Sequence, residues 1–136
     1  MVCRDYQRRL WHRGPVDLAT LAASKYLSLT TFRRDGSAVA TPVWLVRDGD
    51  ALLVTTQASS GKVKRIRNNP AVLLAPCDAR GRMKGEQVPG RAVLQDAEAT
   101  VRTTGLIRRR YGLLGWLLTF RGADDRIGLT ITLGRT

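Results

Sequence analysis

The chain has few of the residues that carry metal or disulfide chemistry. Its 136 residues include two cysteines, Cys3 and Cys77, and one histidine, His12. The cysteines are far apart and form no Cys-x-x-Cys motif, and the histidine is not grouped with other metal-ligating residues. We therefore expect no metal site. Since no signal peptide is evident, we expect reduced thiols in a cytoplasmic protein.

Acidic residues and long hydrophobic runs are also scarce. The 11 Asp and Glu stand against 23 Lys and Arg, which gives a formal net charge of +12. This predicts an anionic partner, either a nucleic acid, a membrane surface or a multiply charged small molecule. The most apolar segment, residues 113–120, is far shorter than the roughly 20 residues of a membrane span, which argues against a membrane protein.

Recognisable nucleic-acid motifs are missing as well. The sequence contains no zinc-finger spacing, no aromatic platform for single strands and no helix-turn-helix pattern. Its basic residues are spread over the whole length instead of forming one stripe. Nucleic acid is therefore the less favoured partner despite the positive charge, and a small anionic ligand is the better one.

What the chain does have is short segments of β-type residues separated by turns. Asp35-Gly36 and Asp48-Gly49 predict hairpin turns, because glycine supplies the positive φ that such turns need. Two such turns in succession predict a three-stranded meander. We expect strands at residues 26–32, 37–47, 51–56, 71–77, 91–94 and 126–133, and helices at residues 15–24 and 97–111. Gly112 is expected to end the second of these helices.

The element pattern predicts a mainly β, α+β fold. About six mostly antiparallel strands with a few flanking helices are typical of a small barrel. Residues 1–14 are expected to form a basic N-terminal arm, and residues 15–136 one domain. Residues 113–120 form an apolar cluster that either packs on the chain's own core or is buried against a partner subunit.

The helix expected between Ser59 and Asn69 is the strongest functional signal. Ser59 or Ser60 is suited to cap its start, and Asn69 with the following proline to end it. The start of the helix offers free N–H groups, two hydroxyls and the ammonium of Lys62, which together favour an anion such as phosphate. Arg65 shares a helix face with Lys62. The alternative is a short solvated helix whose basic residues bind nothing.

Pro42 lies inside the strand expected at residues 37–47. A proline cannot donate to a strand ladder, so this position is expected at an edge, at a bulge or opposite something other than a strand. The backbone of residues 41–44 is therefore a candidate for lying against a ligand. An ordinary edge proline is the alternative interpretation.

Four motifs together resemble a known family. Thr-Pro-Val-Trp at residues 41–44, Thr-Thr at 55–56, Ser-Ser-Gly-Lys at 59–62 and Arg-Asn-Asn-Pro at 67–70 occur in this order. They resemble the pyridoxamine-phosphate-oxidase-like split β-barrel family, and within it the actinobacterial branch of F420-dependent oxidoreductases. The resemblance covers about residues 18–95. It implies a homodimeric six-stranded antiparallel split barrel with a few flanking helices and with cofactor sites at the subunit interface.

The resemblance also implies which residues bind the cofactor. By this resemblance, the cofactor phosphate should be bound by Thr55, Thr56, Ser59, Ser60 and Lys62. The flavin-like rings should lie alongside Thr41, Pro42, Val43 and Trp44. Gly61 and Arg65 complete the expected site. Gly61 stands where FMN-dependent members have an arginine, and Val39 and Trp44 stand where basic residues are expected. The resemblance therefore favours F420 over FMN and argues against vitamin B6 oxidation.

The implied function is that of an F420-dependent oxidoreductase. Such a reductase transfers a hydride from the reduced deazaflavin to an unsaturated small organic substrate, and the protein orients the reactants. The sequence selects no catalytic residue; Tyr111 and a water molecule are both candidates for protonating the product. Three alternatives stay open: an FMN-dependent oxidoreductase, a non-catalytic carrier of a flavin, F420 or a haem-type ligand, and an arginine-rich nucleic-acid-binding module.

Overall fold

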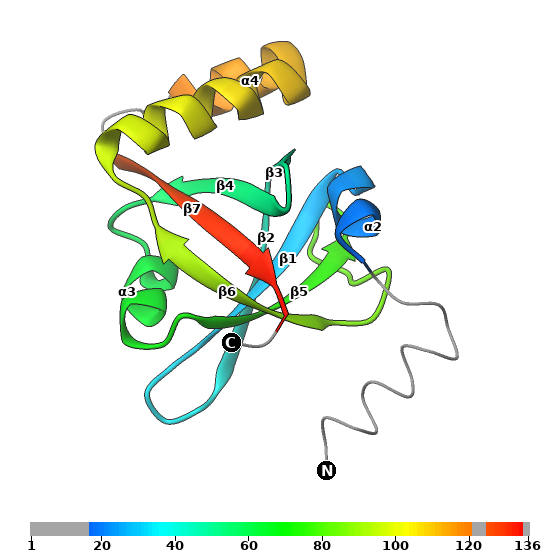
Figure 1. Ribbon diagram of the computed structural model, residues 1–136, viewed down its shortest axis with the longest axis vertical. Coiled ribbons are helices and arrows are strands. Elements are labelled where there is room, and N and C mark those ends of the chain that lie inside the picture. The colour runs from blue at the N-terminus through cyan, green and yellow to red at the C-terminus, as the bar shows by residue number, and fades with distance from the viewer. Residues whose placement is uncertain (1–16, 121–124, 135–136) are drawn as a thin grey trace.

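The computed structural model describes residues 17–120 and 125–134, and leaves out the side chains of residues 113–120. In this part of the chain, seven strands form one antiparallel sheet with three helices around it (Figure 1). The elements are α2 (Leu18–Ala23), β1 (Tyr26–Phe32), β2 (Ala38–Val43), β3 (Leu45–Asp48), β4 (Ala51–Gln57), α3 (Gly61–Asn68), β5 (Ala71–Cys77), β6 (Val88–Leu94), α4 (Ala97–Phe120) and β7 (Arg126–Leu133).

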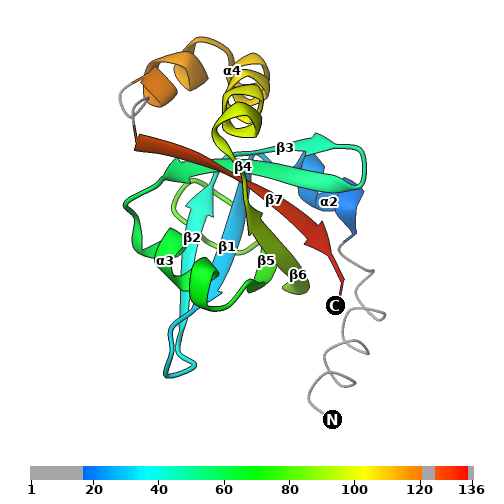
Figure 2. The ribbon, with the colours of Figure 1, turned by 60° about the vertical axis from the view of Figure 1, so that its left-hand side comes forward.

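The sheet is curled into a half-barrel, as Figures 1 and 2 show from two sides. Its strand order is β2-β1-β5-β6-β7-β4-β3. The two edge strands, β2 and β3, are consecutive in the sequence and are separated by Trp44 alone. Helix α2 contacts β5 as well as β3 and β4, and so bridges distant parts of the sheet order. The split between the two edges is therefore where the barrel opens.

Trp44 divides the single strand that was expected at residues 37–47, which is why the sheet has seven strands instead of six. Val43 pairs with Leu27 on β1, whereas Leu45 pairs with Val54 on β4. The chain thus changes partners from one edge of the sheet to the other within a single residue. No local pattern in residues 37–47 specifies this exchange, because it depends on which strands pair in the folded chain.

Several other predictions are confirmed. Gly36 and Gly49 have φ values of 90° and 61°, so both hairpin turns have the expected conformation. Strands β1, β5 and β7 have the predicted bounds, and Pro42 lies on an edge strand. Strand β6 begins earlier than expected, at Val88.

The first helix is shorter than predicted. It begins at Leu18 because the carboxylate of Asp17 accepts a hydrogen bond from the Thr20 N–H at 2.8 Å and so caps it. Pro15, the expected first turn, lies outside the described residues. So do the expected N-terminal arm, Cys3 and His12. Cys77 is a buried free cysteine.

The concave face of the sheet holds the core. Leu27 and Leu29 of β1, Leu74 of β5 and Ile131 of β7 are fully buried there. Helix α3 adds Ile66 to this cluster, and burying each such side chain contributes about 1.5–3 kcal/mol. The packed core fixes the strand ends, and those ends carry the site described below.

Helix α4 lies across β7, β4 and β3, at the top of Figure 1. Gly112 interrupts it with a φ of 65° and a ψ of −144°, so the predicted break is present and helical backbone continues beyond it. Among the described residues, no helix combines the length and hydrophobicity needed to cross a bilayer. Within the same residues, no three His, Cys, Asp or Glu side chains gather into a metal-binding group.

Candidate functional site

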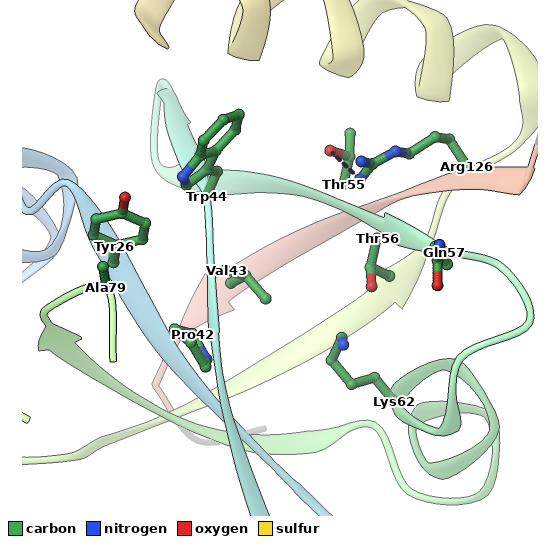
Figure 3. A pocket seen from close by; sticks show the side chains of 10 residues that line it. All are labelled: Tyr26, Pro42, Val43, Trp44, Thr55, Thr56, Gln57, Lys62, Ala79 and Arg126. Atoms are coloured by element: carbon green, nitrogen blue, oxygen red, sulfur yellow. Dashed lines mark hydrogen bonds between the residues drawn. The ribbon is translucent and has the colours of Figure 1, made fainter. Parts of the chain in front are cut away.

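A cleft of about 370 Å³ opens where edge strand β2 diverges from β4 (Figure 3). Its volume falls within the range of about 300–1,000 Å³ that is usual for small-molecule sites. The lining residues come from β1, β2, β4 and β7, from Trp44 between β2 and β3, from the start of α3 and from the loop after β5. They are Tyr26, Pro42, Val43, Trp44, Thr55, Thr56, Gln57, Lys62, Ala79 and Arg126.

One end of the cleft is cationic and hydroxyl-rich. Thr55 and Thr56 lie just before the last residue of strand β4, and Lys62 follows in the first turn of α3. Arg126 opens strand β7 opposite Gln57, and its Nη1 donates to the Thr55 hydroxyl at 3.5 Å. Figure 3 shows these side chains converging on the same side of the cleft. The arrangement offers positive charge and hydroxyl groups to an anionic ligand; we call these four residues, Thr55, Thr56, Lys62 and Arg126, the cationic end.

Like charges are crowded at the cationic end. Partial burial lowers the pKa of the Lys62 ammonium, and repulsion from Arg65 and then Arg126 lowers it further. The pKa of Arg126 is also lowered, by burial and then by Arg108. An anion held among these groups would offset the repulsion and the lost hydration, because it favours the charged form of each.

The helix start itself departs from the expected phosphate grip. Ser60 is the N-cap of α3, but its side chain makes no capping hydrogen bond. The Ser59 hydroxyl instead donates to the carboxylate of Asp125 at 2.6 Å. Neither serine lines the cleft. Asn69 ends the helix in an extended conformation, which fits its place before a proline.

Gly61, Arg65 and Thr41 also lie beside the cleft without lining it. Arg65 Nε donates to the Thr31 hydroxyl at 2.6 Å, which directs its guanidinium toward β1. A Cβ on Gly61 would lie 2.7 Å from Arg65 Nη1, so this glycine leaves room for that guanidinium. The Thr41 hydroxyl lies 3.5 Å from the Leu29 carbonyl of β1. Of the predicted site, the cleft thus unites Pro42, Val43, Trp44, Thr55, Thr56 and Lys62.

The opposite end of the cleft is aromatic and apolar, and we call its residues Tyr26, Pro42, Val43 and Trp44 the aromatic end. Figure 3 shows Tyr26 and Trp44 across the cleft from Lys62. Ala79 closes this side from a loop whose turn is held by Asp78, since that carboxylate accepts from two backbone N–H groups at 2.9 Å. Flat apolar walls of this kind suit an aromatic ring system.

Sequence reasoning missed Tyr26, Gln57, Ala79 and Arg126. Gln57 directly follows the Thr-Thr motif, and this adjacency was an available signal. Arg126 reaches the cleft only because β7 pairs with β4. Tyr26 and Ala79 come to the cleft through strand β1 and the loop after β5, and no local motif marks either position.

A curled antiparallel half-barrel with a ligand-sized cleft at the split between its edges defines the class of split-barrel ligand-binding proteins. The family profile of pyridoxamine 5'-phosphate oxidase matches residues 17–133. The chain belongs to this family. None of the curated proteins matches the chain significantly.

Solved structures share the fold at low sequence identity. The haem storage protein HutZ from Vibrio cholerae superposes with a TM-score of 0.64 at 15% identity, over 84% of each chain. Protein Rv2991 from Mycobacterium tuberculosis gives a TM-score of 0.63 at 23% identity, over 84% of this chain and 76% of its own. A protein described as an F420 reductase gives 0.59 at 20% identity, over 88% and 94%. These likenesses concern the fold.

Proposed function

We propose that this protein is an F420-dependent oxidoreductase acting on an unsaturated small organic substrate. The observation that supports this most directly is the polarity of the cleft, which has a cationic end and an aromatic end within about 370 Å³. A phosphate-bearing cofactor with a flat ring system has the same two parts. The cationic and hydroxyl groups suit the phosphate, and the aromatic and apolar walls suit the rings.

The roles of the residues follow from this polarity. Lys62 and Arg126, with the hydroxyls of Thr55 and Thr56, are proposed to hold the phosphate through charge-assisted hydrogen bonds. The edge backbone at Pro42 and the ring of Trp44 are proposed to orient the ring system and to exclude water from it. When bound, reduced F420 supplies a hydride. The residues of this chain supply orientation and electrostatic stabilisation.

The choice of F420 over FMN rests on charge. F420 carries further negative charges on its tail, and this chain has a formal net charge of +12. Lys64 and Arg67, which are exposed on α3, only add to this general positive charge. One protein of the same fold is described as an F420 reductase, which is consistent with this proposal.

Parallel titrations with F420 and FMN test the proposal. We expect F420 to bind the purified protein more tightly than FMN in fluorescence titrations. Reduced F420 should then be oxidised when enones or quinones are added. Tighter binding of FMN would favour the FMN-dependent alternative, and absence of binding to either cofactor would contradict the proposal.

A non-catalytic carrier of haem or flavin is the second candidate. The fold it shares with the haem storage protein HutZ is the observation that favours it. Among the residues that line the described cleft, only the phenol of Tyr26 resembles a common haem ligand. A haem titration followed at the Soret band, repeated with Tyr26→Phe, separates this candidate from the first. Tight haem binding without turnover of F420 would favour it.

Oligomeric state and location also remain proposals. We propose a homodimer in which a second copy completes the cleft, and sedimentation analysis with and without F420 tests it. A cytoplasmic location remains an expectation from cysteine usage. The nucleic-acid alternative predicts binding that weakens steeply with salt, which retention on immobilised DNA at several salt concentrations measures.

A further inference from the structure

Two backbone segments beside the aromatic end lie at the limits of the strand ladder. Trp44 joins β2 to β3 and belongs to neither strand. Lys25 directly precedes Tyr26, the first residue of β1. Because β3 is an edge strand, backbone groups of Leu45 also lack a second strand to pair with. Trp44 therefore depends on something other than the sheet for its placement, and Tyr26 lies at the very start of its strand.

Arg110 of α4 joins these two segments with one guanidinium. Its Nη1 donates to the Leu45 carbonyl at 2.8 Å, and its Nη2 donates to the Ser24 carbonyl at 2.9 Å. Hydrogen bonds from a charged donor are stronger than neutral ones, and the planar fork fixes the spacing between its two acceptors. The carbonyls held in this way lie one residue from Trp44 and two from Tyr26.

Tyr111 makes a second connection between the same segments. Its hydroxyl donates to the Lys25 carbonyl at 2.7 Å and accepts from the Leu45 N–H at 3.2 Å. Its ring stacks on Trp44 with centroids 4.6 Å apart and planes 7° apart. The guanidinium carbon of Arg110 lies 5.2 Å from the centre of the Tyr111 ring. Three planar groups are thus assembled next to the cleft.

We propose that Arg110 and Tyr111, which we call the α4 clamp, are positioning residues that hold Trp44 and Tyr26 at the aromatic end of the cleft. Neither clamp residue lines the cleft, so both act through the residues they hold. The effect on cofactor binding rests on the proposed function, whereas the placement of Trp44 does not. Tyr111 was a candidate proton donor from the sequence, but its hydroxyl hydrogen already serves the Lys25 carbonyl.

The test uses three clamp variants and one matched control. Tyr111→Leu removes the stacked ring and the hydroxyl, Tyr111→Phe removes the hydroxyl alone, and Arg110→Gln removes the charged fork. Arg109→Gln is the control, because Arg109 is exposed on the same helix turn and its loss changes the net charge equally. All variants are made in a Trp11→Phe, Trp116→Phe background, so that Trp44 is the remaining tryptophan.

Two measurements are made on folded protein. Acrylamide quenching of Trp44 without ligand should increase in Tyr111→Leu and Arg110→Gln but not in Arg109→Gln. The Kd for F420 should rise roughly tenfold in Tyr111→Leu and roughly threefold in Tyr111→Phe, which keeps the stack. A purely stabilising contact would lower the unfolding temperature and leave quenching and Kd unchanged in the folded protein.

Clamp variants that match the control in both Trp44 quenching and Kd would overturn the proposal. If the parent protein binds neither F420 nor FMN, the proposed function fails, but quenching of Trp44 still decides whether the clamp holds this residue. If the parent binds F420 and Tyr111→Leu binds it equally well with Trp44 more exposed, the positioning role in binding is refuted while the proposed function stands.

Discussion

The two ends of the cleft are built on opposite physical principles. At the cationic end, burial lowers the pKa of the Lys62 ammonium, and repulsion from Arg65 and then Arg126 lowers it further. At the aromatic end, Trp44 is stacked on Tyr111, and the neighbouring backbone is fastened by hydrogen bonds from Arg110. Without a bound anion, the like charges at the cationic end therefore repel one another. The groups at the aromatic end are held by stacking and hydrogen bonds without any ligand.

This difference indicates that the two ends of the cleft have different roles in ligand binding. Crowded charges at the cationic end gain most from a bound phosphate, so this end should supply affinity. Fixed side chains at the aromatic end lose little freedom when a ring system binds, so this end should supply orientation. Substitutions at the cationic end should consequently lower affinity without lowering stability, whereas substitutions at the aromatic end should lower both.

Lys62→Ala should give the largest effect, and mainly on binding. Losing a charged hydrogen bond to phosphate should weaken F420 binding by about 1.5–3 kcal/mol. Because the folded-state pKa of Lys62 is below its unfolded value, its charge destabilises the ligand-free fold below that folded pKa, and this cost disappears as pH rises past the unfolded value. Ligand-free stability at neutral pH should therefore stay equal or increase.

The matched control for this variant is Lys64→Ala, which removes an exposed lysine from the same helix. Titration and thermal unfolding measure both variants. An unchanged Kd for Lys62→Ala, or a loss as large in the control, would remove the distinction between a specific phosphate contact and general charge.

Gly112→Ala should act mainly on stability. The φ of 65° with a ψ of −144° is a conformation that only glycine adopts without strain, so alanine should destabilise the fold by about 1–3 kcal/mol. Gly105→Ala is the control within the same helix, because a Cβ there meets no atom within 4 Å. This control should stabilise the protein by about 0.5–1 kcal/mol. Thermal unfolding giving the same sign for both variants would contradict the prediction.

Trp44→Leu should have a smaller effect that is confined to the aromatic end. Loss of the stack on Tyr111 should cost about 0.5–1.5 kcal/mol of stability, and Trp44→Phe should retain most of it. A double-mutant cycle with Tyr111→Leu should return a coupling energy of the same size. A coupling energy near zero would mean that the two rings do not stabilise one another.

How much of this site could be predicted depends on how far apart its parts lie in the sequence. Thr55, Thr56 and Lys62 belong to one strand-to-helix segment, so local patterns were enough to place them together. Arg126 completes the same end from 71 residues beyond Thr55. It arrives there through the pairing of β4 with β7, which no local pattern specifies.

The aromatic end depends on tertiary structure to a greater extent. Trp44 lies two residues after Pro42, which is on an edge strand as predicted. The interruption between β2 and β3 at Trp44 arises because the chain passes there from one edge of the sheet to the other. The Ser59 hydroxyl was expected to face the ligand and bonds Asp125 instead, since a carboxylate from a distant segment competes for it. Such competition between local and distant partners is decided only in the folded chain.

The pH dependence of binding should give the smallest effect and bears on the cationic end alone. Because the pKa of Lys62 is lowered by burial and by neighbouring arginines, its ammonium should begin to lose its proton at a lower pH than an ordinary lysine. F420 affinity should therefore stay level around neutrality and fall as the pH rises through the pKa of Lys62. Lys62→Arg should abolish this fall, because a guanidinium stays charged throughout. Titrations at fixed ionic strength and several pH values measure the affinity. If affinity falls equally in the parent and in Lys62→Arg at alkaline pH, another group is responsible for the fall. Trp44→Leu should show the same pH dependence of affinity as the parent.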